Sequence, residues 1–234
     1  MEKEKAMRIC QGLKSRGSQK WIRYVVNQCP EILNSRIIAQ LEIPTNEGIN
    51  WLSPLANDDY AEYQDQEFLA VLKTKLGNVP LEKFWPNGGP VWDALGRSDS
   101  GNLMLVEAKS HVGEMVSPRS QASPQSKALI SKSLKECKKY LKSKSNIDWA
   151  RSFYQYTNRL AHLYFLRELN RLPAFLVFVY FVGDKEMKGP ESEEEWRGAI
   201  KLLHSYLGIG RTRLTPFMAD VFIDVKSLSI GRQV

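Results

Sequence analysis

The chain has 234 residues and a formal net charge of +7. Its composition, 43% hydrophobic and 25% charged residues, is typical of a globular protein and excludes a low-complexity or intrinsically disordered chain. The length is enough to bury a substantial core, and we expect a single domain over residues 1–234. The positive charge suits a polyanionic partner.

Cysteine usage and hydropathy indicate a reducing compartment and no membrane. Cys10, Cys29 and Cys137 are widely spaced, which supports neither a disulfide framework nor a zinc site. The most apolar run, residues 174–182, is too short to cross a bilayer as a helix. The charged start of the chain lacks the apolar core of a secretory signal. We therefore expect a cytoplasmic protein.

The hydrophobic pattern predicts helices and strands in alternation. An apolar stripe with Trp21 and Val25 predicts a helix over 18–29, and a loop that could hold a short strand follows at 44–57. The later elements are expected in this order: a helix over 58–76, a hairpin over 90–109, a basic polar stretch, a helix over 149–171, a strand over 174–182, a helix over 193–207 and a strand over 218–225. This order predicts an α/β (α+β) fold, with a mixed central sheet flanked by helices.

The hairpin is the most informative segment. Two apolar runs flank the turn-forming residues 98–102, and with the turn centred on Ser100, residues whose numbers sum to 200 face each other. Asp93 then lies opposite Glu107, with Cβ atoms about 4.5–5.5 Å apart. Side chains alternate with a period of two, so Lys109 shares the face of Glu107. Two acids and one lysine should therefore converge in an otherwise apolar strand pair.

This constellation suits a divalent cation. Two opposed carboxylates repel each other and are costly to desolvate, so a cation is expected between Asp93 and Glu107. Mg²⁺, with Mn²⁺ as the alternative, is the natural candidate, because Mg²⁺ is held by one or two carboxylates, waters and phosphate oxygens. Lys109 could stabilise charge on a phosphate, or orient or deprotonate the attacking water. The competing interpretation is a buried salt bridge that only holds the hairpin together.

These residues resemble the signature of the PD-(D/E)xK nuclease superfamily, which has the restriction-endonuclease-like fold. The family has an Asp on one strand and an acid-x-Lys on the next, here Asp93 and Glu107-Ala108-Lys109. The resemblance implies that Asp93, Glu107 and the carbonyl of Ala108 bind metal and that Lys109 is catalytic. The sequence departs from the pattern because its proline, Pro90, lies three positions before the aspartate.

The resemblance covers roughly residues 57–185, where the expected elements agree with the family's α-βββ-α-β core. We therefore predict a nuclease-like core over 57–225 and a helical N-terminal extension over 1–56. The implied function is metal-dependent hydrolysis of phosphodiester bonds, with DNA as the expected substrate. The alternatives are a nuclease-like module that binds nucleic acid without cleavage and a metabolic α/β protein. Many nucleases of this type dimerise, which leaves a homodimer open.

Further candidates lie on two predicted helices. Many family members carry a glutamate on the helix before the hairpin that points at the metal, and Glu67 is our choice, with Glu62 and Asp65 as competitors. A solvated helix face is the alternative. Gln155 and Arg159 share a polar face of a later helix, and such side chains suit phosphate contacts.

Seven lysines gather between residues 127 and 144, with Glu136 as the only acid. We expect Lys132, Lys135 and Lys139 to follow a phosphate backbone, which would make the affinity for nucleic acid strongly salt-dependent. The competing interpretation is a solvated surface with no ligand.

Overall fold

A mixed five-stranded sheet forms the centre of the described part of the chain in this computed structural model, which describes residues 8–10, 15–41, 43–117 and 122–228. The first three strands in the sheet order pair antiparallel, and the last two continue parallel to the third. The sheet order is β2 (Ile49–Ser53), β4 (Ala94–Ser98), β5 (Leu103–Lys109), β6 (Ala174–Val182) and β7 (Met218–Asp224).

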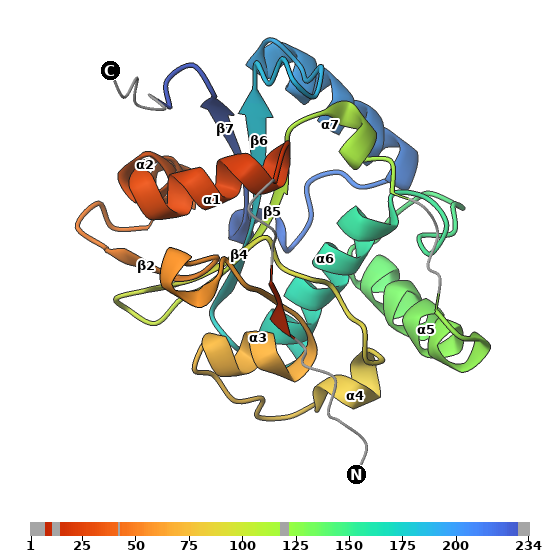
Figure 1. Ribbon diagram of the computed structural model, residues 1–234. Coiled ribbons are helices and arrows are strands. Elements are labelled where there is room, and N and C mark those ends of the chain that lie inside the picture. The colour runs from red at the N-terminus through yellow and green to blue at the C-terminus, as the bar shows by residue number, and fades with distance from the viewer. Residues whose placement is uncertain (1–7, 11–14, 42, 118–121, 229–234) are drawn as a thin grey trace, which may run out of the picture.

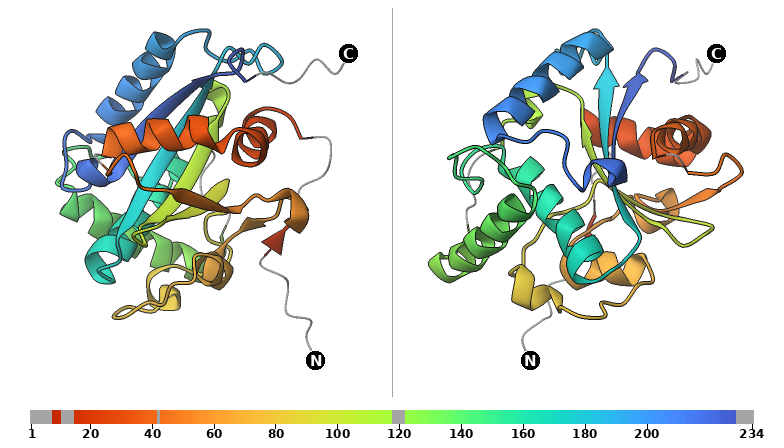
Figure 2. Two further views of the ribbon diagram at one scale, coloured as in Figure 1. Left: turned by 90° about the vertical axis from the view of Figure 1, so that its left-hand side faces the viewer. Right: turned by 180° about the vertical axis from the view of Figure 1, so that it is seen from behind.

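Helices cover both faces of this sheet (Figures 1 and 2). The right-hand view of Figure 2 separates two red helices from the green-to-blue helices on opposite sides of the strands. One face carries α1 (Ser18–Gln28) and α2 (Pro30–Leu41). The other elements are β1 (Arg8–Ile9), η1 (Ala56–Asp58), β3 (Glu62–Tyr63), α3 (Asp65–Val71), α4 (Leu81–Phe84), η2 (Val112–Glu114), α5 (Pro124–Tyr140), α6 (Tyr154–Tyr164), the π-helical η3 (Phe165–Leu169), α7 (Glu193–Leu207) and η4 (Thr215–Phe217).

The alternation of side chains along β5 decides which layer each residue meets. Met104 and Val106 belong to the cluster beneath α1 and α2, whereas Leu103 and Leu105 pack in the cluster that includes α6. Successive side chains of a strand point to opposite faces, so Glu107 and Lys109 continue the odd-numbered row toward α6. The alternation of side chains therefore places the charged Glu107 and Lys109 in the layer between β5 and α6.

Several predictions about local structure are confirmed. The hairpin pairs Ala94 with Val106 and Arg97 with Leu103, which is the register in which numbers sum to 200. The strand over 174–182 and the helix over 193–207 have the predicted bounds. Helix α7 is capped as its ends indicate, because the Ser192 side chain accepts the N–H of Glu195 and Gly208 adopts a left-handed conformation.

The predicted helix over 58–76 is wrong. The segment forms β3 and the short α3 instead, because Asp59 and Tyr60 turn the chain with positive φ angles. The N–H of Trp92 then bonds to the carbonyl of Tyr63, which holds that residue extended. Lys73, again with positive φ, closes the helix early.

Other segments also differ from expectation. A helix that was not predicted, α2, begins at Pro30, since proline is tolerated in the first turn of a helix. The basic stretch forms α5, capped by Ser123. Strand β2 lies inside the predicted extension 1–56 yet pairs with β4, so a boundary at residue 57 divides the sheet. No helix in the described ranges is long and apolar enough to cross a membrane.

Strand β6 lies inside the sheet between β5 and β7, and most of its side chains are buried. Leu176 is completely buried, and truncating a buried leucine typically costs about 2–5 kcal/mol. We expect Leu176→Ala to lower the free energy of unfolding by this amount in urea titrations. The same change at Leu202, exposed on α7, is the control and should stay within about 0.5 kcal/mol of the wild type. Equal losses would contradict the assigned packing.

Candidate active site

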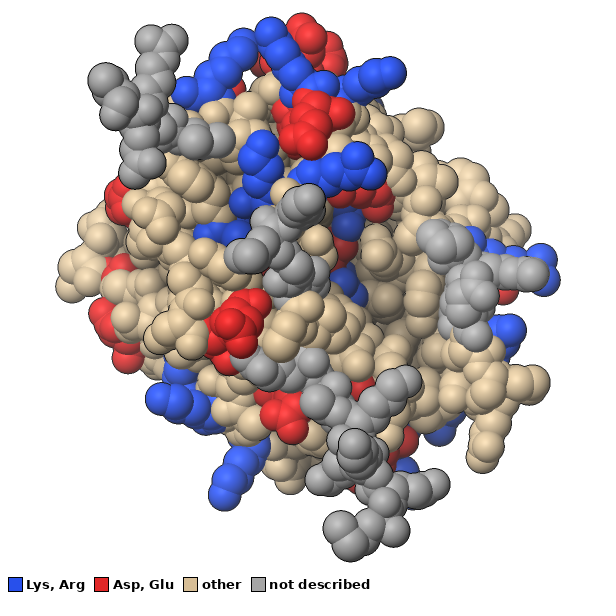
Figure 3. Space-filling view, viewed as in Figure 1, with Lys and Arg blue, Asp and Glu red and all other residues tan. Residues whose placement is uncertain are grey.

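A cleft of about 770 Å³ lies beside the end of β5. It corresponds to the hollow near the centre of Figure 3. The residues of the predicted metal site line it, and so do Gln155 and Arg159 of α6. The structure therefore brings together side chains from the hairpin and from a helix that lies some fifty residues later in the sequence.

Asp93 lies directly before β4, and both its backbone and its side chain form hydrogen bonds to β5. The N–H of Asp93 still donates to the carbonyl of Val106 at 3.2 Å. Its carboxylate then accepts the N–H of Ala108 at 2.6 Å, in place of a backbone partner. In an antiparallel ladder the N–H and C=O of one residue face the same neighbour. The carbonyl of Ala108 therefore faces the side on which Asp93 lies.

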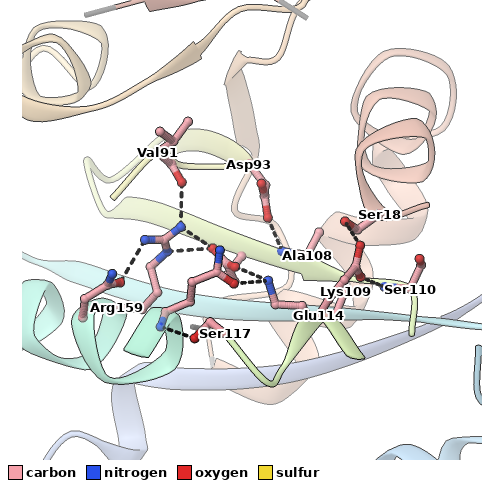
Figure 4. Close-up of polar contacts among 12 residues, drawn as sticks. Ser18, Val91, Asp93, Ala108, Lys109, Ser110, Glu114, Ser117 and Arg159 are labelled. Atoms are coloured by element: carbon pink, nitrogen blue, oxygen red, sulfur yellow. Dashed lines mark hydrogen bonds and ion pairs between the residues drawn. The ribbon is translucent and has the colours of Figure 1, made fainter. Parts of the chain in front are cut away.

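Glu107 is held between the side chains of Lys109 and Arg159, both of which are labelled in Figure 4. The ammonium of Lys109 contacts one carboxylate oxygen. The guanidinium of Arg159 contacts the other, through Nε at 2.6 Å and Nη2 at 2.5 Å. Only 2% of Glu107 is exposed, so this double pairing offsets the cost of burying its charge.

The two cations are themselves fixed in place. Lys109 also donates to Oε1 of Gln155 at 3.2 Å. Arg159 donates to the carbonyl of Val91 at 2.6 Å and to Oδ1 of Asn158 at 2.9 Å. Its guanidinium lies 4.7 Å from the ring centroid of Trp92. Arg159 thus joins α6 to the segment that carries Asp93 as well as to β5.

The pKa values of the two carboxylates, Asp93 and Glu107, are shifted in opposite directions. Burial raises the pKa of Asp93 to about 7, the neighbouring Glu107 charge adds to the shift, and Lys109 opposes it. Burial would also raise the pKa of Glu107, but the charges of Arg159 and Lys109 outweigh it and hold that pKa below its ordinary value. Near neutral pH, Asp93 can exchange a proton for a cation while Glu107 stays ionised.

The donors present fit a hard divalent cation. Asp93, Glu107 and the Ala108 carbonyl offer oxygen atoms, the ligands that Mg²⁺ prefers. Within the described ranges, no ion pair engages Asp93, although its surroundings are strongly desolvated. No three His, Cys, Asp or Glu side chains there form a closed metal site. A cation would therefore complete its shell with water or phosphate oxygens.

The glutamate beside this site is Glu62, one of the two competing choices. Glu62 directly precedes Tyr63, whose backbone pairs with Trp92, the residue before Asp93. Glu62 is 3% exposed and lines the cleft. Glu67 is exposed on α3 and does not line the cleft, so the expectation that it approaches Asp93 is not met.

Asp65, the other competing choice, has a structural part in the loop beside the cleft. Its carboxylate accepts the N–H groups of Gly88 and Gly89 at 2.9 and 2.8 Å. Both glycines line the cleft. Asp65 therefore shapes one wall of the cleft from behind.

The sequence pattern does not indicate several of the residues that line the cleft. Arg16 lines the cleft from the segment before α1, and Glu114 lines it from the turn after β5. Glu114 accepts the hydroxyl of Ser18 at 2.9 Å and the N–H of Ser110 at 2.5 Å, so it ties these two segments together. Long-range contacts of this kind leave no periodic signal in the sequence.

The lysine-rich helix lies apart from the cleft. Lys132, Lys135 and Lys139 are exposed on α5, and none of them lines the cleft. Helix α5 packs against α6, on the side of the molecule away from β4 (Figure 1).

Comparisons with known proteins found no match: no family model, no curated protein and no solved structure matches the chain. The case for a function therefore depends on the geometry and chemistry of the site.

The raised pKa of Asp93 predicts a pH-dependent stability. The folded protein binds a proton at Asp93 that the unfolded chain releases, so this contribution is complete at low pH and is lost as the pH rises through about 7. We expect Asp93→Asn to gain stability relative to the wild type from about pH 5 to pH 8, in urea titrations with EDTA. A difference between the two proteins that is constant across this range would contradict the assignment.

Proposed function

We propose that this protein is a metal-dependent phosphodiester hydrolase that acts on nucleic acid, with DNA as the expected substrate. The observation that carries the proposal is the convergence of Asp93, Glu107 and Lys109 in one cleft. A half-buried acid with a raised pKa beside an ionised acid and a lysine is typical of a functional site.

The arrangement of the strands supports this proposal. The antiparallel strands β2, β4 and β5 are followed by helices and by the parallel strand β6. Three strands, a helix and a further strand is the order that the PD-(D/E)xK resemblance implies. In that comparison, the hairpin β4–β5 corresponds to the catalytic hairpin.

The residues of the site divide the chemistry among them. Asp93, Glu107 and the carbonyl of Ala108 would hold Mg²⁺ or Mn²⁺, which supplies positive charge to the scissile phosphate and activates water. Lys109 places an ammonium at the cleft, where it stabilises charge that develops on the phosphate. Arg159 positions Glu107 through its guanidinium.

The charge balance of the cleft favours a cation as the partner of an anionic substrate. Its described lining holds four carboxylates against three basic side chains. A phosphate would meet net negative charge there, unless Asp93 is protonated or a cation is bound. The four acids are Glu62, Asp93, Glu107 and Glu114, and the three bases are Arg16, Lys109 and Arg159.

One observation favours a second candidate, a nucleic-acid-binding module without catalysis. Both oxygens of Glu107 already contact cations of the protein itself. A carboxylate balanced in this way is stable without a metal ion. An ionised carboxylate has about four acceptor positions, however, so these contacts leave room for a further ligand.

A nuclease assay on plasmid, linear duplex and single-stranded DNA tests the proposal. Cleavage should require Mg²⁺ or Mn²⁺, stop with EDTA and disappear in Asp93→Asn. Binding without metal-dependent cleavage of any of the three substrates would favour the binding module.

The place of Glu62 predicts a difference between two glutamates. Glu62→Gln removes a carboxylate that lines the cleft together with Asp93, so the affinity for Mn²⁺ should fall by about 10- to 100-fold in calorimetric titrations. Glu67→Gln is the matched control and should leave the affinity unchanged, because Glu67 is exposed on α3. The opposite result would restore Glu67 as the acid of the site.

Catalysis and binding should separate in two variants. Lys109→Ala removes a charge that acts mainly in the transition state, so turnover should fall by about 100-fold or more with little change in DNA affinity. Replacing Lys132, Lys135 and Lys139 together by alanine should instead weaken affinity and flatten its salt dependence, with turnover retained at saturating substrate.

Circular dichroism distinguishes these effects from unfolding. If Lys109→Ala mainly unfolds the protein, the ion pair with Glu107 is structural. If the triple lysine variant binds DNA as the wild type does, α5 is a solvated surface.

A further inference from the structure

The groups that would act on a phosphodiester lie at the bottom of the cleft. Lys109 is 9% exposed and Arg159 is 4% exposed. The volume of the cleft, about 770 Å³, lies within the ~300–1,000 Å³ of pockets that enclose a small ligand. A duplex carries its phosphates on the outside of a wide rod, whereas an unpaired strand can extend a single phosphodiester into a pocket.

Exposed apolar side chains gather at the mouth of this cleft. Among the described residues, five large apolar side chains are exposed, and three of them are Ile9, Val112 and Val116. Ile9 and Val116 line the cleft, and Val112 begins the turn η2 beside it. Val116 is 64% exposed. Apolar side chains exposed at the rim of a polar cleft offer contact surface to the apolar part of a ligand.

Basic side chains do not border the cleft in the way that a duplex requires. A protein that follows both strands of a duplex neutralises phosphates on each side of its site. Of the three basic residues in the described lining, only Arg16 is exposed.

We propose, on the basis of the nuclease function proposed above, that the cleft takes an unpaired DNA strand. One phosphodiester reaches Lys109 and the cation site, while the neighbouring bases pack against Val116 and Ile9 at the mouth. Packing bases on apolar or aromatic side chains is tolerant of sequence, because every base has an apolar face. The site therefore selects single-stranded DNA, overhangs and frayed ends over paired duplex.

A labelled oligonucleotide tests this selection in three forms: single-stranded, as a blunt duplex, and as a duplex with an unpaired overhang. Binding is measured by fluorescence anisotropy with Ca²⁺, and cleavage is measured with Mg²⁺ or Mn²⁺. We expect the single strand to bind at least about tenfold more tightly than the blunt duplex, about 1.4 kcal/mol. Cleavage of the third form should fall within its overhang.

Two matched variants test the apolar mouth. Val116→Asp places a negative charge where the bases should pack, so affinity for the single strand should fall about tenfold, within the range measured for stacking contacts. Leu202→Asp changes an aliphatic side chain of similar exposure on α7, outside the cleft lining, and should leave affinity unchanged. Circular dichroism checks that both variants fold.

The outcomes separate this inference from the proposed function. Equal binding and cleavage of single strand and blunt duplex would overturn the inference and leave the nuclease intact. Selective binding of the single strand without cleavage in any metal would overturn the nuclease and keep the selection. Failure to bind any form, or an unaltered Val116→Asp, would overturn the assigned cleft.

Discussion

The burial of the Glu107 carboxylate is the constraint on which the rest of the site depends. A charge at the end of a fully buried strand is tolerated only with close countercharges. Lys109 supplies one from the same strand, and Arg159 supplies the other from α6. Because Arg159 also binds the carbonyl of Val91, this pairing fixes α6, β5 and the approach to β4 relative to one another. The wall of the cleft is therefore built by electrostatics as much as by packing.

Asp93 is the counterpart that this pairing leaves unbalanced. Asp93 is less deeply buried than Glu107, and its pKa is shifted in the opposite direction to that of Glu107. Two neighbouring groups whose pKa values are shifted in opposite directions by their surroundings are characteristic of sites that move protons or bind cations. Arrangements that cost stability occur most often at functional sites. A desolvated acid beside another acid, such as Asp93 beside Glu107, is an arrangement of this kind.

The cleft combines a charged floor with an apolar mouth. Lys109 and Arg159 lie at the depth where a phosphate would react, whereas Ile9 and Val116 lie near the solvent. A nucleotide chain has the same division, since its phosphates are charged and its bases present apolar faces. The match in polarity depends on chain segments that the sheet and α6 bring together, so no single motif records it.

The sequence by itself determined the elements whose signals are local. Turn-forming residues 98–102 between apolar runs gave the hairpin register, and with it the meeting of Asp93 and Glu107. Tertiary structure decided what depends on distant partners: β2 joins the sheet by pairing with β4, and the bridge from Tyr63 to Trp92 sets Glu62, not Glu67, beside the acids. Periodicity reports how one element divides between core and solvent. It does not report which distant strand completes a ladder, because that choice is made by the packing of the whole chain.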